Sequence, residues 1–237
     1  MRRLTLCAAL ALLSATAVRA EPPIGSRLGE RTEKRAIGRE SDSAMTAHEM
    51  ARCMLDRKPK DVRAFLTETN EVENHRAAQK LSATMDCFAI GGDENAEAAI
   101  VMFSIDVMRG MLAEELIKVS HRSFEQLPAL PAQRGYARRW FAVSERAGAV
   151  DEMATCTADV NPRAVLALID TRPYSDQERA AIGAIAPVLG NCLVAGAKVD
   201  ANRQALRAAL ADALFQRVAN PQEIVPTAPD KPGEPNQ

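Results

Sequence analysis

The chain has 237 residues, with 30 basic and 31 acidic side chains and a formal net charge of −1. This balance of interspersed charges provides neither the basic surface of a nucleic-acid-binding protein nor a patch for anionic lipid. Aromatic residues make up only 4% of the chain, whereas alanine, leucine, arginine and glutamate are abundant, and this composition favours helices over strands. We therefore predict an all-α protein.

The first 20 residues have the pattern of a signal peptide. Arg2 and Arg3 form a short positive region, residues 4–18 are apolar or small, and Ala20 completes a cleavage site. The apolar stretch is too short to cross a bilayer as a helix, and Cys7 would leave with the peptide. Cleavage would leave 27 basic against 31 acidic residues, a formal net charge of −4. We expect an exported protein, periplasmic or secreted, that is not transmembrane after cleavage; a buried first helix is the alternative.

The rest of the chain divides into segments by composition. Many charges with three glycines and two prolines mark a flexible N-terminal segment, Pro128 and Pro131 mark a linker, and five prolines mark a polar tail. The predicted segments are 21–43 (flexible), 44–121 (helical unit 1), 122–135 (linker), 136–219 (helical unit 2) and 220–237 (disordered and Pro-rich).

The two helical units repeat one sequence pattern. EMARC ends at Cys53 and EMATC ends at Cys156. After each cysteine, a proline follows at +6, an apolar pair at +12 and +13, and a second cysteine at +34 or +36. Further on, RGMLAEEL at 109–116 matches RAALADAL at 207–214. We predict an internal duplication, in which a unit of roughly four helices and about a hundred residues occurs twice.

Each unit has the same four expected helices. The first ends near a cysteine, the second begins at a proline, the third begins at an N-capping residue, and the fourth has an apolar stripe of helical period. Pro187 is expected to kink or split the third helix of unit 2. The expected first helices are Thr46–Leu55 and Ser144–Ala158, the second begin at Pro59 and Pro162, the third at Asn70 and Ser175, and the fourth stripes are Val101–Val119 and Leu206–Val218.

Four cysteines remain after cleavage of the signal peptide, and an even number in an exported chain suggests two disulfides. A unit that once existed alone would carry its own bridge, which favours Cys53–Cys87 and Cys156–Cys192. Four free thiols are the alternative. A zinc site is less favoured because the chain has no C-x₂₋₄-C or H-x₃₋₅-H spacing.

The chain contains no catalytic motif that we can assign. It lacks H-E-x-x-H, C-x-x-C, G-x-S-x-G, a P-loop and G-x-G-x-x-G. His48, Met50, Cys53 and Met54 lie within one short segment, and such soft ligands suit Cu(I). Methionine, however, commonly fills irregular cores, and a bridged cysteine is no ligand. We therefore predict no metal, no cofactor and no catalytic residue.

Two sets of charged residues are interpreted structurally. The adjacent carboxylates Glu114 and Glu115 could do acid–base chemistry, but neighbours on a helix do not share a face, so we expect a solvated ion-pair surface. Arg109 and Arg207 occupy one repeat position, and we expect each to form a salt bridge within its unit or to bond a neighbouring helix end; a shared anion site is the alternative.

Residues 138–140 combine two basic side chains with the only tryptophan of the chain. Arg138, Arg139 and Trp140 are therefore a candidate contact with a protein partner in the cell envelope. A lone tryptophan beside a linker can instead pack the two units together. The function predicted from the sequence is binding or scaffolding without catalysis. The alternatives are a periplasmic enzyme or enzyme accessory with a site between the units, and a carrier of a small apolar ligand.

Overall fold

The computed structural model describes residues 34–83, 87, 104–133, 135–193 and 202–221, and side-chain burial is described from residue 44 onward. All regular secondary structure in these ranges is helical, which confirms the all-α prediction for this part of the chain. The predicted signal peptide and the tail beyond residue 221 lie outside the described residues. No described helix is both long enough and apolar enough to cross a bilayer.

The helices follow the predicted order, but several elements differ from the prediction. Helix α1 begins at Lys34, so the segment predicted to be loose is helical over its last ten residues; good helix formers such as arginine, alanine and glutamate outweigh its single glycine there. A short helix, α5, lies in the predicted linker. Helix α8 runs through Pro187 without splitting, because this proline is on the exposed side, where water can bond the freed carbonyl. The helices are α1 (Lys34–Arg57), α2 (Pro59–Thr67), α3 (Glu71–Ser82), α4 (Ile105–Val119), α5 (His121–Glu125), η3 (Arg139–Val143), α6 (Gly148–Val160), α7 (Pro162–Ile169), α8 (Asp176–Cys192) and α9 (Arg203–Ala219).

Side-chain caps explain where several helices begin. Asn70 accepts hydrogen bonds from the backbone N–H groups of the first turn of α3, and Asn161 does the same for α7. Ser175 accepts from the N–H of Glu178 at the start of α8, while the Glu178 carboxylate accepts from the N–H of Tyr174. These bonds satisfy donors that a helix end leaves without partners. The predicted starts of the second and third helices therefore hold.

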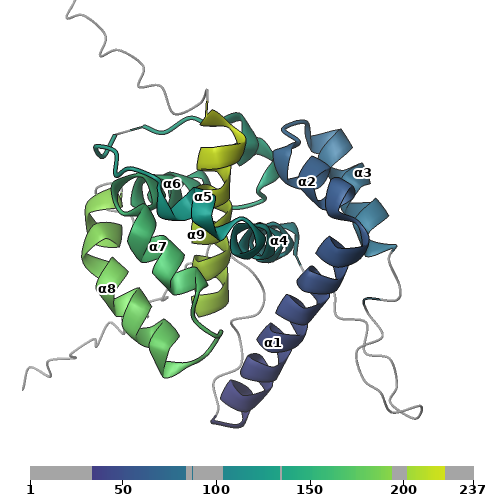
Figure 1. The fold of residues 1–237 in the computed structure, drawn as a ribbon, viewed down its shortest axis with the longest axis horizontal. Coiled ribbons are helices and arrows are strands. Elements are labelled where there is room, and N and C mark those ends of the chain that lie inside the picture. Colours follow the sequence, from purple (N-terminus) through teal and green to yellow (C-terminus); the bar gives the residue numbers. More distant parts are fainter. Residues whose placement is uncertain (1–33, 84–86, 88–103, 134, 194–201, 222–237) are drawn as a thin grey trace, which may run out of the picture.

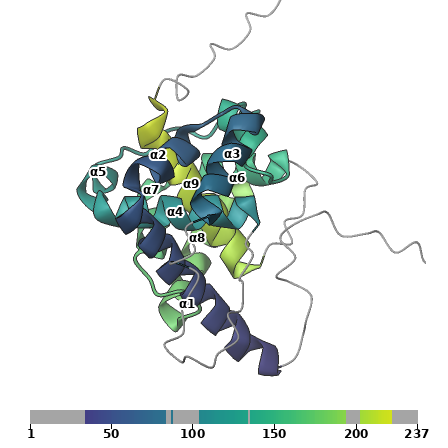
Figure 2. The ribbon, with the colours of Figure 1, turned by 90° about the vertical axis from the view of Figure 1, so that its right-hand side faces the viewer.

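Helices α4 and α9 form the centre of the molecule and cross each other (Figure 1). Helices α1, α2 and α3 lie on one side of this crossing, and α6, α7 and α8 lie on the other (Figures 1 and 2). The closest approach is at Gly110, where an added Cβ would lie 2.2 Å from the Cα of Ala208. Glycine is required at this position because the two backbones leave no room for a side chain.

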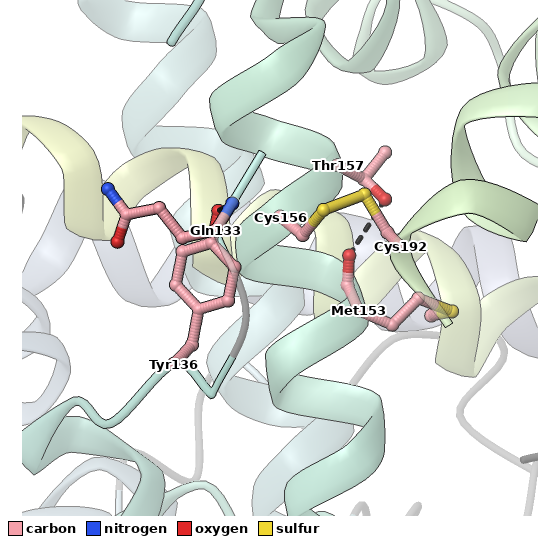
Figure 3. Close-up of a disulfide and its surroundings, with 6 residues drawn as sticks. All are labelled: Gln133, Tyr136, Met153, Cys156, Thr157 and Cys192. Atoms are coloured by element: carbon pink, nitrogen blue, oxygen red, sulfur yellow. Dashed lines mark hydrogen bonds between the residues drawn. A yellow bond between two sulfur atoms is a disulfide. The ribbon is translucent and has the colours of Figure 1, made fainter. Parts of the chain in front are cut away.

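The structure contains two disulfides, Cys53–Cys87 and Cys156–Cys192, which is the pairing expected from the repeat. The second joins α6 to the last residue of α8 (Figure 3). It is packed with Tyr136 and Met153 in a small apolar cluster beside the main core. The two bridges close loops of similar length. Each joins a cysteine in the first helix of one half to a cysteine further along the same half.

Candidate functional site

The crossing of α4 and α9 contains charged side chains that are almost fully buried. Arg207 of α9 has no exposed surface and donates to both carboxylate oxygens of Glu114 of α4, at 2.7 and 2.8 Å. The same guanidinium donates to the Glu178 carboxylate at 3.1 Å and to the carbonyl oxygen of Ile169, at the end of α7, at 2.8 Å. Such a fully bonded guanidinium offsets much of the cost of burying these charges.

Arg109 of α4 makes the corresponding contacts, with the arginine now on α4 and the carboxylate on α9. It donates to the Asp212 carboxylate of α9 at 3.1 Å and to the carbonyl oxygens of Phe65 and Leu66, at the end of α2. Each arginine was expected to form a salt bridge within its unit or to bond a neighbouring helix end, and both bond a helix end. Arg207 also forms a salt bridge with Glu178 inside its own unit, whereas the ion pairs with Asp212 and Glu114 cross between the two halves of the chain. The physical reason is that α4 and α9 meet face to face, so the nearest buried carboxylate lies on the other helix.

One group of side chains at the crossing, called here the first corner, consists of His48, Glu114, Glu115 and Lys118. The Lys118 ammonium lies 2.7 Å from Glu114 Oε1 and 2.9 Å from Glu115 Oε1. Nδ1 of His48, from α1, lies 3.5 Å from Glu114 Oε1. Glu114 and Glu115 are only 1% and 3% exposed. The prediction of a solvated surface for these two glutamates is therefore wrong: α1 and α9 cover α4 here, and a sequence pattern does not reveal that cover.

A second corner, consisting of Arg146, Asp151, Asp212 and Gln216, lies on the other side of the crossing. Arg146 bridges the two carboxylates, at 2.7 Å from Asp151 Oδ1 and 2.6 Å from Asp212 Oδ2. The Gln216 amide donates to Asp212 at 3.1 Å. The two corners therefore each hold a basic side chain between buried acceptors.

Burial and pairing shift several pKa values in opposite directions. Burial lowers the pKa of His48 more than the nearby Glu114 raises it, so the imidazole is neutral at pH 7. Burial alone would raise the pKa of Glu114, but the Arg207 hydrogen bond and the positive charges around it lower that pKa to about 2. The pKa of Asp212 is likewise lowered, because Arg109 and Arg146 outweigh its burial. Burial raises the pKa of Asp151 despite Arg146.

The hydrogen bonding of His48 determines what its second ring nitrogen can do. Its Nε2 lies 3.1 Å from Nε2 of Gln204, while Gln204 Oε1 and His48 Nδ1 are buried without a hydrogen-bond partner. If the Gln204 amide is turned end for end, its Oε1 accepts from the imidazole Nε2–H, and only Nδ1 is left without a hydrogen-bond partner. The Nδ1 lone pair then faces the Glu114 carboxylate.

A small internal hollow lies elsewhere, between η3, α6 and α9. Buried polar atoms of Arg138, Thr155, Asp159 and Arg217 around it have no hydrogen-bond partner among the described residues. Its space for the centre of a water molecule is about 10 Å³, which suits one water and no larger ligand. Burial raises the pKa of Asp159 despite Arg217.

The residues singled out from the sequence fall in different places. Trp140 is 2% exposed and belongs to the main core. Arg138 is half-buried and Arg139 is exposed. Met50 and Met54 are core residues. The sequence analysis missed Arg146 and the partnership of Asp212. The aligned octapeptides did contain a signal for Asp212, because an acidic residue follows each arginine by five positions.

Comparison with protein-family models, curated proteins and solved structures finds no match for this chain.

Proposed function

We propose that the protein is an exported protein of two duplicated helical units that acts by binding or scaffolding rather than by catalysis. The observation that carries this proposal is the mutual pairing of the buried charges at the α4–α9 crossing. Glu114, Asp212 and their arginines bond one another and adjacent helix ends, which ties the two halves to each other. Groups engaged in this way support a fixed shape.

The duplication is supported by contacts between equivalent positions. Gly110 and Ala208 each follow an arginine by one residue, and they meet at the crossing. Glu114 and Asp212 each follow an arginine by five residues, and each binds the arginine of the other half. Reciprocal contacts of this kind are expected when two copies pack around a two-fold axis, as in an isologous dimer. A fused dimer of one ancestral unit accounts for them.

Export is supported by the two disulfides together with the signal-peptide pattern of residues 1–20. Disulfides of this structural type persist in oxidising compartments. Fractionation of cells that produce the full chain should place it in the periplasm or medium, with a mass lower by the 20-residue peptide. Cytosolic protein that keeps the leader and has free thiols would contradict export.

The binding role is tested by cross-linking in the native envelope, followed by identification of captured proteins. Arg139→Glu changes the charge of an exposed residue in the candidate contact, and Arg163→Glu makes the same change at an exposed residue of α7. We expect one partner that the wild type and Arg163→Glu capture equally and that Arg139→Glu loses. Equal capture by all three proteins would remove the candidate contact.

The second candidate function is an enzyme or enzyme accessory with a site between the two halves. The convergence of buried groups with shifted pKa values at the crossing favours it. A screen of the purified protein for hydrolase and transferase activity, repeated with Glu115→Gln, separates the two functions. Turnover by the wild type that Glu115→Gln abolishes would support catalysis instead of scaffolding. A carrier of an apolar ligand, the third candidate, rests on the methionines of the first half, and native mass spectrometry that finds no ligand would dispose of it.

A further inference from the structure

We propose that His48, Glu114 and Glu115 form a binding site for one divalent transition-metal ion of the zinc class, which enters by displacing the Lys118 ammonium. This site goes beyond the binding or scaffolding function and is independent of it. Its failure would leave that function untouched.

The geometry of the first corner fits a single small cation. One ligand atom from each of the three residues can be chosen so that all lie within 4.8 Å of one another. Zinc–ligand bonds of about 2.0–2.2 Å at tetrahedral angles place ligand atoms about 3.3–3.6 Å apart, so the three side chains would have to close in by up to about 1.5 Å. All three side chains are buried, and they come from two helices that pack together, α1 and α4.

The imidazole of His48 supplies the second, independent indication of a ligand. His48 is 7% exposed, yet its Nδ1 has no hydrogen-bond partner and faces the carboxylates. A buried nitrogen without a partner is costly unless something satisfies it. Once the Gln204 amide is turned so that Oε1 accepts from Nε2–H, the Nδ1 lone pair points into the corner. Histidines that bind metals are usually oriented by such a bond at the other ring nitrogen.

The carboxylates already bind a cation at this place. Lys118 places its ammonium between Glu114 and Glu115, and its side chain is 30% exposed, so the ammonium can return to water along its flexible stem. In the second corner, Arg146 fills the corresponding place between Asp151 and Asp212, and its side chain is only 5% exposed. The cation of the first corner is therefore the exchangeable one.

The donor atoms determine the class of metal. One imidazole nitrogen with carboxylate oxygens suits Zn²⁺, Co²⁺ or Ni²⁺, whereas Mg²⁺ and Ca²⁺ prefer six or more oxygens. Cu(I) is not favoured, because Cys53 is bridged and supplies no thiolate. Glu115 is the main carboxylate ligand, since the buried Arg207 holds both oxygens of Glu114, whereas Glu115 pairs with Lys118 and with Arg52, whose side chain is exposed and can turn to water.

The proposal is tested by titrating the purified, disulfide-intact protein with Zn²⁺ in a calorimeter and with Co²⁺ in a spectrophotometer. We expect one Zn²⁺ per chain and a visible Co²⁺ absorption band. Glu115→Gln and His48→Gln should weaken binding by about 10-fold or more, and His48→Gln should remove the nitrogen-dependent band. Lys118→Met removes the competing ammonium and should strengthen binding by about 10-fold.

The control variant is His121→Gln. His121 is near the surface beside Asp170 and Glu125, a grouping that could bind metal adventitiously. Its substitution should leave the affinity unchanged. The proposal is overturned if the wild type binds no Zn²⁺, if His121→Gln abolishes binding, or if Lys118→Met binds no more tightly than the wild type. Lys118→Met keeps the test decisive should His48→Gln fail to fold, because it predicts a gain.

Discussion

Substitution of Gly110 by alanine tests whether the α4–α9 crossing holds the molecule together. The new Cβ would lie 2.2 Å from the Cα and 2.5 Å from the carbonyl oxygen of Ala208. Both atoms are backbone, so no side chain can move aside. Carbon atoms pack at about 3.5 Å or more, and the helices must therefore separate by about 1.3 Å.

The energy of this separation has two parts. Overpacking of a well-packed interior costs about 1–3 kcal/mol. Separation also lengthens the buried ion pairs of Arg207 with Glu114 and Arg109 with Asp212, now 2.7 and 3.1 Å, and a fully broken buried pair costs about 3–5 kcal/mol. Against this, alanine improves helix propensity by about 1 kcal/mol over glycine. If each of the two pairs loses about half of its strength, the free energy of unfolding should fall by about 3–7 kcal/mol.

The assay is urea unfolding with linear extrapolation, with both disulfides intact. The matched control is Gly183→Ala in α8, because an added Cβ at this exposed helical position meets nothing within 4 Å. It should stabilise the protein by about 0.5–1 kcal/mol. A Gly110→Ala protein as stable as the wild type would refute the role of the crossing, whatever the control does.

Three further predictions concern the paired charges and the bridges. Arg207→Met leaves Glu114 buried without its main partner and should lower the free energy of unfolding in urea by about 3–5 kcal/mol. The double variant that also carries Glu114→Gln should lose less than the sum of the losses of the two single variants. The free energy of unfolding should fall as the pH drops below 6.5, because the unfolded chain takes up protons at His48 and then, around pH 4.5, at Glu114, while the folded chain resists both. The contribution of Glu114 is about 3 kcal/mol, from the difference between its ordinary pKa and its folded-state pKa of about 2. Glu114→Gln should abolish that contribution. Unchanged stability down to pH 3 would contradict it. Replacing Cys53 and Cys87 together by alanine should cost about 3–4 kcal/mol for a loop of 34 residues, and a melting temperature equal to that of the wild type would argue against the bridge.

The helix starts and the disulfides could be predicted from sequence because their signals are local or repeated. Asn70 and Ser175 cap helices through bonds to residues two or three positions away, which a sequence displays directly. The cysteine pairing followed from the recurrence of one spacing. Arg146 could not be predicted in the same way, since its partners Asp151 and Asp212 come together only when α6 and α9 pack.

The burial of Glu114 and Glu115 escaped prediction for a different reason. Apolar periodicity identifies a helix with one buried face and assigns its charged residues to solvent. Helix α4, however, is buried at every position from Asp106 to Ile117, and α9 is buried from Arg207 to Arg217. A helix enclosed on all sides has no exposed face for its charges, so they pair across the crossing instead.

The two corners differ in a way that separates structural stability from the proposed metal binding. His48 lies five residues before Cys53, and Asp151 lies five residues before Cys156. In the second half this position holds a carboxylate that Arg146 neutralises deep in the interior. In the first half it holds a neutral imidazole, and the carboxylates beside it pair with the partly exposed Lys118. Reciprocal arginine pairs fix one register of the crossing, because a slip by one turn would leave buried charges unpaired at about 3–5 kcal/mol each. Both halves need those pairs, but only the first places a ligand nitrogen beside an exchangeable cation, and a second function would have to arise there.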